Sequence, residues 1–226
     1  LVRDWGNVIE NPRAGLYGAV VVAAQGTRFT DPGSGADASS RASARVDAYP
    51  AAGAPYRDVT LFLQDEDGVF GTAVMPYLGK LAGVVGLNYR SAPLAARLEK
   101  NKDASKIFLG GAESDPGTAL IEAYAGDAVQ MHVLAPFSEQ AHVFTVENHR
   151  WQFEPGRKGS DLLSAVQVGA LEAVRIVLAD GAGGKSALPG DYLYGDHRLP
   201  YREAGLWGLF RVYPKDAKGV KLLPLK

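Results

Sequence analysis

Short apolar runs separated by glycine and proline dominate the chain, and several of them alternate between apolar and polar positions. Alternation with a period of two is typical of half-buried strands, and glycine and proline between the runs mark turns. The pattern therefore predicts a protein made mostly of β-strands. The clearest predicted strands are 18–24, 59–63, 119–124, 128–134, 142–146, 173–178, 191–194 and 207–213. One short surface helix is predicted over 92–102, where a proline opens a segment with charges on one side.

A change in composition divides the chain. Residues 31–55 are rich in glycine, serine, alanine and aspartate and contain few large apolar side chains. This composition is typical of a linker or a long surface loop. We therefore expect the closing strands of a preceding β-domain in 1–30, a linker or long loop in 31–55, and a nearly complete β-domain in 56–226.

Two segments of the chain are similar to each other. Ala14-Gly-Leu-Tyr-Gly-Ala-Val-Val-Val matches Ala204-Gly-Leu-Trp-Gly-Leu-Phe-Arg-Val. Both are predicted to be the closing strand of a domain. If the second copy ends a complete domain, the first copy ends another one, so we expect further domains or chains that complete residues 1–30, in an oligomer or larger assembly. The alternative is that a Gly-Leu-aromatic-Gly pattern occurs twice by chance.

Composition and charge exclude several classes of function. The chain has 226 residues, of which 46% are hydrophobic, and this is enough for a sizeable core. Lys and Arg number 24 against 25 Asp and Glu, for a net charge of −1, so we expect no nucleic-acid partner. The absence of cysteine excludes disulfides, iron–sulfur clusters and thiolate-bound metal in this chain. No apolar run approaches the length of a membrane span.

The end of the chain carries a pattern known from one family. Pro189-Gly-Asp-Tyr-Leu-Tyr-Gly-Asp-His resembles the final segment of multicopper oxidases, where a Pro-Gly-x-Tyr-x-Tyr strand leads into His-Cys-His. Gly126-Asp127 and His142-Val-Phe-Thr-Val-Glu-Asn-His are similar to the family's Gly-Asp strand and its His-Pro-Phe-His-Leu-His-Gly-His motif. Asp65-Glu-Asp, Met75-Pro-Tyr and Gly86-Leu-Asn-Tyr-Arg look like the bacterial, manganese-oxidase-like branch. The resemblance implies an all-β fold, a cupredoxin-like Greek-key β-sandwich, for 56–226, with 1–30 closing a preceding cupredoxin-like domain.

The family's blue-copper ligands are mostly replaced in this sequence. Blue copper needs a thiolate, two imidazoles and a weak axial thioether. By the resemblance, the cysteine position holds Asp196, the second imidazole position holds Tyr201 and the axial position holds Leu206, so that only His142 remains. A carboxylate cannot replace the thiolate electronically. We therefore expect no blue copper in this chain.

The positions that resemble the trinuclear-copper ligands have changed as well. Thr145 and Glu147 stand where the family has imidazoles, Gly195 replaces the first histidine of His-Cys-His, and His197 remains. One hypothesis is a remodelled metal site formed by His142, Glu147, Asp196 and His197, whose nitrogen and oxygen ligands suit Mn(II) or a plain Cu(II) site. The alternative, which we favour, is that these polar residues hydrogen-bond to each other and preserve the shape of a former copper site.

The resemblance leads to two hypotheses about function. In the first, the chain is a structural portion or subunit of a multicopper-oxidase-like assembly that oxidises a metal ion or small reductant with O₂. Copper then belongs to the assembly, with no confident cofactor in this chain, and the location is extracellular or periplasmic. In the second, the chain is a copper-free cupredoxin that acts as a structural or binding module.

Other patterns favour no chemistry. Asp65-Glu66-Asp67 is predicted to be a solvated turn, with a cation site as the alternative. Gly181-Ala-Gly-Gly-Lys-Ser lacks the spacing of a phosphate-binding loop and is predicted to be a flexible hairpin loop. No serine lies in a Gly-x-Ser-x-Gly elbow, so hydrolase chemistry has no support in the sequence.

Overall fold

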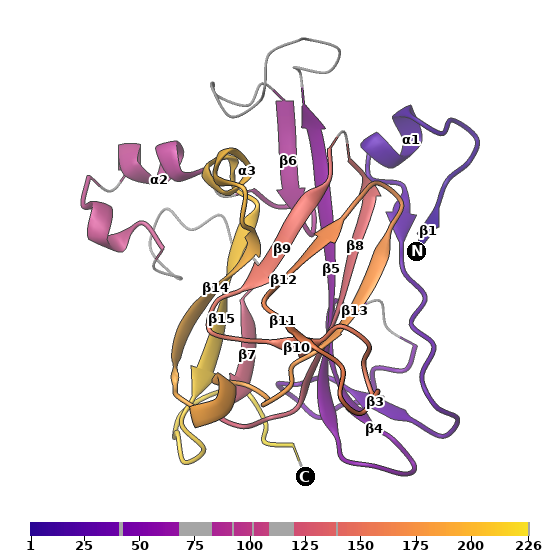
Figure 1. Ribbon diagram of the computed structural model, residues 1–226, viewed down its shortest axis with the longest axis vertical. Coiled ribbons are helices and arrows are strands. Elements are labelled where there is room, and N and C mark those ends of the chain that lie inside the picture. Colours follow the sequence, from indigo (N-terminus) through magenta and orange to yellow (C-terminus); the bar gives the residue numbers. More distant parts are fainter. Residues whose placement is uncertain are drawn as a thin grey trace.

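Two β-sheets packed face to face form the body of the molecule (Figure 1). The computed structural model describes residues 1–40, 43–67, 83–91, 93–100, 102–108, 120–138 and 140–225. The first sheet contains β3 (Arg28–Thr30), β4 (Arg45–Tyr49), β5 (Tyr56–Asp67), β6 (Gly83–Leu87), β8 (Val129–Phe137) and β13 (Ala173–Val177). The second sheet contains β7 (Ile121–Tyr124), β9 (His142–Val146), β12 (Ala165–Val168), β14 (Gly190–Asp196) and β15 (Trp207–Tyr213).

The order of the strands shows a Greek key. The first sheet has the order β13-β8-β5-β4-β3, with β6 paired to β5, and the second has the order β12-β9-β14-β15-β7. The pairs β5 with β8 and β15 with β7 are parallel, whereas the other pairs are antiparallel. The chain crosses between the sheets after β6, after β7, after β8, after β12 and after β13. This confirms the predicted all-β, cupredoxin-like Greek-key β-sandwich.

The core lies between the two sheets, where alternate side chains of the central strands meet. The first sheet contributes Leu61, Leu63, Met131 and Val133, and the second contributes Phe144, Val146, Phe210 and Val212. All of these side chains are buried. The predicted strands 142–146 and 207–213 have the bounds of β9 and β15. The alternation of apolar and polar side chains is clear within each of these segments, so the sequence alone predicts them.

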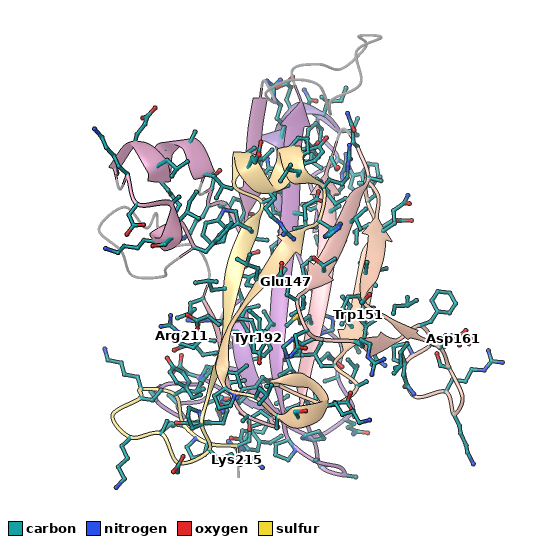
Figure 2. The ribbon with its side chains drawn as sticks, turned by 60° about the vertical axis from the view of Figure 1, so that its left-hand side comes forward. Glu147, Trp151, Asp161, Tyr192, Arg211 and Lys215 are labelled. Atoms are coloured by element: carbon teal, nitrogen blue, oxygen red, sulfur yellow. The ribbon has the colours of Figure 1, made fainter. Side chains whose placement is uncertain are left out.

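Smaller elements surround the sandwich. They are β1 (Val2–Arg3), α1 (Glu10–Arg13), β2 (Tyr17–Gly18), α2 (Leu94–Lys100), β10 (Trp151–Gln152), β11 (Leu162–Leu163), α3 (Leu199–Ala204) and the 3₁₀ turns Ala104–Lys106 and Gly184–Ser186. The helix predicted at 92–102 is α2, and it is shorter at both ends. Figure 2 shows that the loop with Asp161 projects away from the body, whereas Trp151 at its base is buried in the core. Within the described ranges, none of the helices is long and apolar enough to cross a membrane.

Two segments differ from the prediction. The predicted linker 31–55 contains β4, which pairs with β3 and β5, so this part of it is a central strand of the first sheet. The predicted strand 18–24 was wrong beyond its first residue, since only Tyr17 and Gly18 pair, with β1. Residues 19–24 carry a strand pattern but have no ladder partner among the described strands. Strand assignment needs that partner as well as the pattern.

Candidate functional site

His142 lies between two carboxylates in the interior of the sandwich. His142 opens β9 and Asp196 ends the neighbouring β14, so that the pairing of these strands brings the two side chains together. The Nδ1 atom of His142 is 2.7 Å from Oδ2 of Asp196, and its Nε2 atom is 3.1 Å from Oδ1 of Asp65. Asp65 comes from β5 in the opposite sheet. All three side chains are fully buried, and we call them the Asp–His–Asp cluster.

The cluster holds its imidazole in the charged form. Burial alone lowers the pKa of His142, but the hydrogen bonds and negative charges of Asp196 and Asp65 outweigh burial and raise this pKa from 6.5 to about 9. Both ring nitrogens then donate a hydrogen to a carboxylate. The imidazolium is therefore a buried cation between two anions at neutral pH.

The surroundings of the cluster are closed. The ring of Tyr201 lies edge-on to His142, with ring centroids 5.2 Å apart, and Leu206 is fully buried nearby in the same core. The backbone N–H of Arg198 donates to Oδ1 of Asp196 at 2.8 Å. These residues occupy the positions that the resemblance gives to the blue-copper ligands. They do not fit that metal, because the thiolate is absent and both imidazole nitrogens are already hydrogen-bonded.

Sequence reasoning missed Asp65 as a partner of His142. The prediction of a solvated turn at 65–67 was wrong for Asp65, since β5 continues to Asp67 and turns the Asp65 side chain into the interior. The acidic run was visible, but its contact with His142 spans 77 positions of the chain. Of the other softer similarities to the manganese-oxidase-like branch, Met75-Pro-Tyr lies outside the described residues.

Ser138 adds a second contact at the same imidazole nitrogen. Its Oγ lies 3.0 Å from Nε2 of His142, so that Ser138, His142 and Asp196 form a chain like that of a serine nucleophile and its base. The base position is occupied, however, because Nε2 donates its hydrogen to Asp65. An imidazolium held in this way cannot take the hydroxyl proton of Ser138, and the geometry therefore does not support hydrolase chemistry.

The other two residues of the predicted metal site lie apart from the cluster. Glu147 is exposed and forms an ion pair with Arg202, with 3.3 Å between Oε1 and Nη1. The side chain of His197 is exposed, while its backbone N–H donates to the carbonyl of Val143 at 2.7 Å. The structure thus joins His142 to Asp196 and leaves Glu147 and His197 at the surface. In the described part of the chain, no three His, Asp or Glu side chains are arranged to hold a metal ion.

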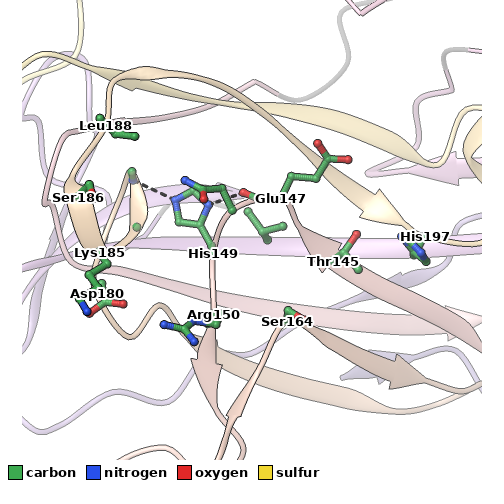
Figure 3. A pocket seen from close by; sticks show the side chains of 15 residues that line it. Thr145, Glu147, His149, Arg150, Ser164, Asp180, Lys185, Ser186, Leu188 and His197 are labelled. Atoms are coloured by element: carbon green, nitrogen blue, oxygen red, sulfur yellow. Dashed lines mark hydrogen bonds between the residues drawn. The ribbon is translucent and has the colours of Figure 1, made fainter.

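Glu147 and His197 instead line a surface pocket of about 510 Å³ (Figure 3). The pocket lies where β9 and the loop with Gly184–Ser186 meet, and its wall also carries Thr145, Arg150 and Lys185. Arg150 and Lys185 are exposed, as is Glu147, so the wall of the pocket presents two positive charges and one negative charge to solvent. Thr145, Glu147 and His197 are the positions that the resemblance relates to the trinuclear-copper ligands.

His149 forms the floor of this pocket and binds only backbone. Its Nδ1 donates to the carbonyl of Glu147 at 2.7 Å, and its Nε2 accepts from the N–H of Gly183 at 2.9 Å, as the dashed lines of Figure 3 show. Burial lowers the pKa of His149, and the Glu147 carbonyl offsets this only in part. The ring is therefore neutral. It ties β9 to the glycine loop, which was predicted to be flexible but forms a 3₁₀ turn with buried glycines.

Comparisons with known proteins point to one group of solved structures. No protein-family model matches the sequence, and a comparison with curated proteins finds no match. The multicopper oxidase McoA from Aquifex aeolicus is 16% identical, with a TM-score of 0.42 over 69% of this chain and 29% of that chain. A multicopper oxidase from Campylobacter jejuni, described as a metallo-oxidase, is 12% identical, with a TM-score of 0.44 over 73% of this chain and 31% of that chain.

A blue copper oxidase from Nitrosomonas europaea is similar in the same way. It is 15% identical, with a TM-score of 0.42 over 72% of this chain and 46% of that chain. The chain thus spans less than half the length of each of these three proteins. At these identities, the similarity concerns the fold.

Proposed function

We propose that this chain is a copper-free, cupredoxin-like module with a structural role in a multicopper-oxidase-like assembly. The assembly as a whole oxidises a metal ion or a small reductant with O₂, and its coppers are bound by other domains or chains. Its location is extracellular or periplasmic. The relation to the manganese-oxidase-like branch remains part of this proposal.

The observation that carries the proposal is the Asp–His–Asp cluster. In a copper site, a cation is held between anionic and imidazole ligands. Here, the protonated imidazole of His142 is the cation, and Asp65 and Asp196 are the anions on either side of it. The cluster joins the two sheets, because Asp65 belongs to one sheet and His142 with Asp196 to the other. It supports a role in holding the sandwich together where a metal would otherwise do so.

The metal content of natively purified material tests this proposal. Elemental analysis by mass spectrometry is combined with the intact masses of all co-purifying chains. We expect several coppers per particle together with polypeptide rich in His-x-His and His-Cys-His motifs. Copper-free material that contains this chain alone contradicts the oxidase assembly.

Metal binding by the purified chain is the second test. Cu(II) and Mn(II) are titrated separately and followed by electron paramagnetic resonance and calorimetry. We expect no stoichiometric site that depends on the cluster, so that His142→Gln and the wild type behave alike. A site of either ion that is lost in His142→Gln, Glu147→Gln or His197→Gln contradicts the proposal and favours a remodelled metal site.

A second candidate function is a copper-free binding module, and the pocket above His149 favours it. This pocket is the right size for a small ligand, and its wall presents the exposed charges of Glu147, Arg150 and Lys185. A binding module needs no copper-containing companion. The masses and metal content of the native particle therefore separate the two functions.

A further inference from the structure

The two similar segments of the sequence have the same local structure. In the first, α1 is followed by Gly15 with φ of +95°, and in the second, α3 is followed by Gly205 with φ of +117°. The N–H of Leu16 donates to the carbonyl of Asn11 at 2.9 Å, and the N–H of Leu206 donates to the carbonyl of Tyr201 at 2.9 Å. Both helices thus end in the same way and lead into an extended segment.

The second copy closes the sandwich. After Gly205, the chain enters β15, whose inward-facing side chains Phe210 and Val212 join Leu206 in the core. These three side chains are at most 2% exposed. The backbone of β15 pairs with β14 on one edge, antiparallel, and with β7 on the other edge, parallel. This copy therefore shows the environment of a closing strand: a hydrogen-bonded strand on each edge and a hydrophobic core against its inward-facing side chains.

The first copy has apolar side chains at the same three positions, but they are not enclosed by a core. Leu16, Val20 and Val22 stand at the positions of Leu206, Phe210 and Val212, and they are 54%, 71% and 89% exposed. Between described residues, the backbone of 19–23 makes no hydrogen bond. Unpaired backbone next to exposed alternating apolar side chains is the signature of a strand open to pairing.

The opposite side of the first copy is anchored on this chain. Tyr17 stacks on Tyr89, with ring centroids 4.9 Å apart and planes 4° apart, and contacts Phe62 at 5.2 Å. Its hydroxyl donates to Oε1 of Gln64 at 2.8 Å. Residues 17–21 line a pocket against β4 and β5. Ala19 and Val21 are half-buried like Tyr17, whereas Val20 and Val22 remain mostly exposed and only border shallow pockets on this sandwich.

We propose that residues 16–23 form the closing strand of a second cupredoxin-like sandwich. The partner is a cupredoxin-like sheet without a closing strand of its own, carried by the same polypeptide or by another chain. At Tyr17 and Gly18 the antiparallel edge is already occupied by β1, in the register that β14 has with β15. The partner supplies the continuation of this antiparallel edge along 19–23 and a parallel strand on the other edge, as β7 does for β15. Its core receives Leu16, Val20 and Val22. This inference deepens the proposed function by naming the surface through which the module joins its assembly.

Photo-crosslinking in the native host tests the proposal. A benzophenone amino acid replaces Val22 in the full chain, the natively formed particle is irradiated, and the attached peptide is identified by mass spectrometry. We expect a peptide from a strand of a cupredoxin-like sandwich other than that of residues 56–226. A crosslink to 56–226 of a second copy overturns the proposal, because β15 already fills that position there. A crosslink to a protein of any other fold also overturns it.

Hydrogen exchange provides an independent measurement on the same particle. We expect the amides of 19–23 to exchange at least 100-fold more slowly in the particle than in the purified chain, because strand pairing protects them. Equal rates in both overturn the proposal. Val20→Asp combined with Val22→Asp is expected to abolish association with the partner, whereas Leu162→Asp, at another exposed apolar position, is expected to leave it intact.

Failure of this inference and failure of the proposed function are distinguishable. If the chain binds copper through His142, the copper-free role fails. The closing-strand proposal is then still supported by slow exchange of 19–23 and by a crosslink from position 22 to a cupredoxin-like sheet. If the particle contains copper and 19–23 exchange freely in it, the oxidase assembly stands and the closing-strand proposal fails.

Discussion

The two buried histidines at either end of β9 differ in charge, since the ring of His142 is cationic at neutral pH and the ring of His149 is neutral. His142 is fully buried and His149 is 2% exposed, and they lie at the start of β9 and just beyond its end. His142 has carboxylates on both nitrogens, whereas His149 has a backbone carbonyl on one and a backbone N–H on the other. The hydrogen-bond partners, and not the depth of burial, decide whether each ring is charged.

The comparison also separates two kinds of structural role. The charge of His142 holds two sheets together through Asp65 and Asp196. The neutral ring of His149 connects a strand end to a loop through backbone groups, and it packs edge-on against Tyr192 at 4.8 Å. We therefore expect changes at His142 to affect the stability of the whole sandwich, and changes at His149 to affect mainly the wall of the pocket.

The largest effect is expected from His142→Leu. This change leaves Asp65 and Asp196 buried without their cation, and removing one partner of a buried ion pair costs about 3–5 kcal/mol. Urea unfolding at pH 7 measures the loss. The matched control adds Asp65→Asn and Asp196→Asn to His142→Leu, and should recover much of the stability, because no buried anions remain. A loss below about 1 kcal/mol for His142→Leu would show that the imidazole is not charged in the fold.

The pH dependence of stability should have opposite signs at the two histidines. The folded pKa of His142, about 9, lies above its ordinary value of 6.5, so its contribution is complete below pH 6.5 and is lost as the pH rises to about 9. A shift of this size corresponds to roughly 3 kcal/mol. The lowered pKa of His149 works in the other direction, because its contribution is present above pH 6.5 and is lost as the pH falls.

Unfolding free energies measured between pH 5 and 9 check these signs. In the variant that combines His142→Leu with Asp65→Asn and Asp196→Asn, which leaves no buried carboxylate in the cluster, the alkaline decline should disappear while the acid decline remains. Proton and nitrogen NMR of the imidazole rings at pH 7 should show both nitrogens of His142 protonated and only Nδ1 of His149 protonated. A neutral His142 ring at pH 7 would contradict the comparison.

A smaller effect is expected from His149→Phe. Phenylalanine fills the space between Tyr192 and Phe210 but leaves the buried N–H of Gly183 without an acceptor, at a cost of about 1–3 kcal/mol. Hydrogen exchange should show faster opening of 181–186 with little change in β5. His149→Gln, which keeps an acceptor, serves as the control and should lose less. Faster exchange spread over both sheets would show that His149 supports the whole sandwich as His142 does.

The smallest effect is expected from His132→Gln. His132 also lies beside a carboxylate, with 3.1 Å from its Nε2 to Oδ1 of Asp58, but its side chain is 19% exposed. Solvent screening weakens such a pair, so we expect a loss of at most about 1 kcal/mol in urea unfolding. A loss equal to that of His142→Leu would mean that a carboxylate neighbour alone, without complete burial, accounts for the effect.

Much of the sandwich was accessible from the sequence. The alternation in 142–146 and 207–213 is a local property, and it gave the bounds of β9 and β15. The sequence predicted that His142 and Asp196, as polar residues of a former metal site, would hydrogen-bond to other polar residues of that site, and they bind each other. The strands β3, β4 and β12 were missed because they are short or lie in segments of polar and small residues.

The sequence by itself determined which segments favour extended structure and which chemical groups are present, because periodicity and side-chain type are properties of neighbouring residues. Only the tertiary structure decided that Asp65 meets His142 from the opposite sheet, that Glu147 and His197 remain at the surface, and that 19–23 stays unpaired while β15 is buried. Charge state and strand pairing are set by partners that lie far away along the chain. Two segments with similar sequence therefore reach different environments.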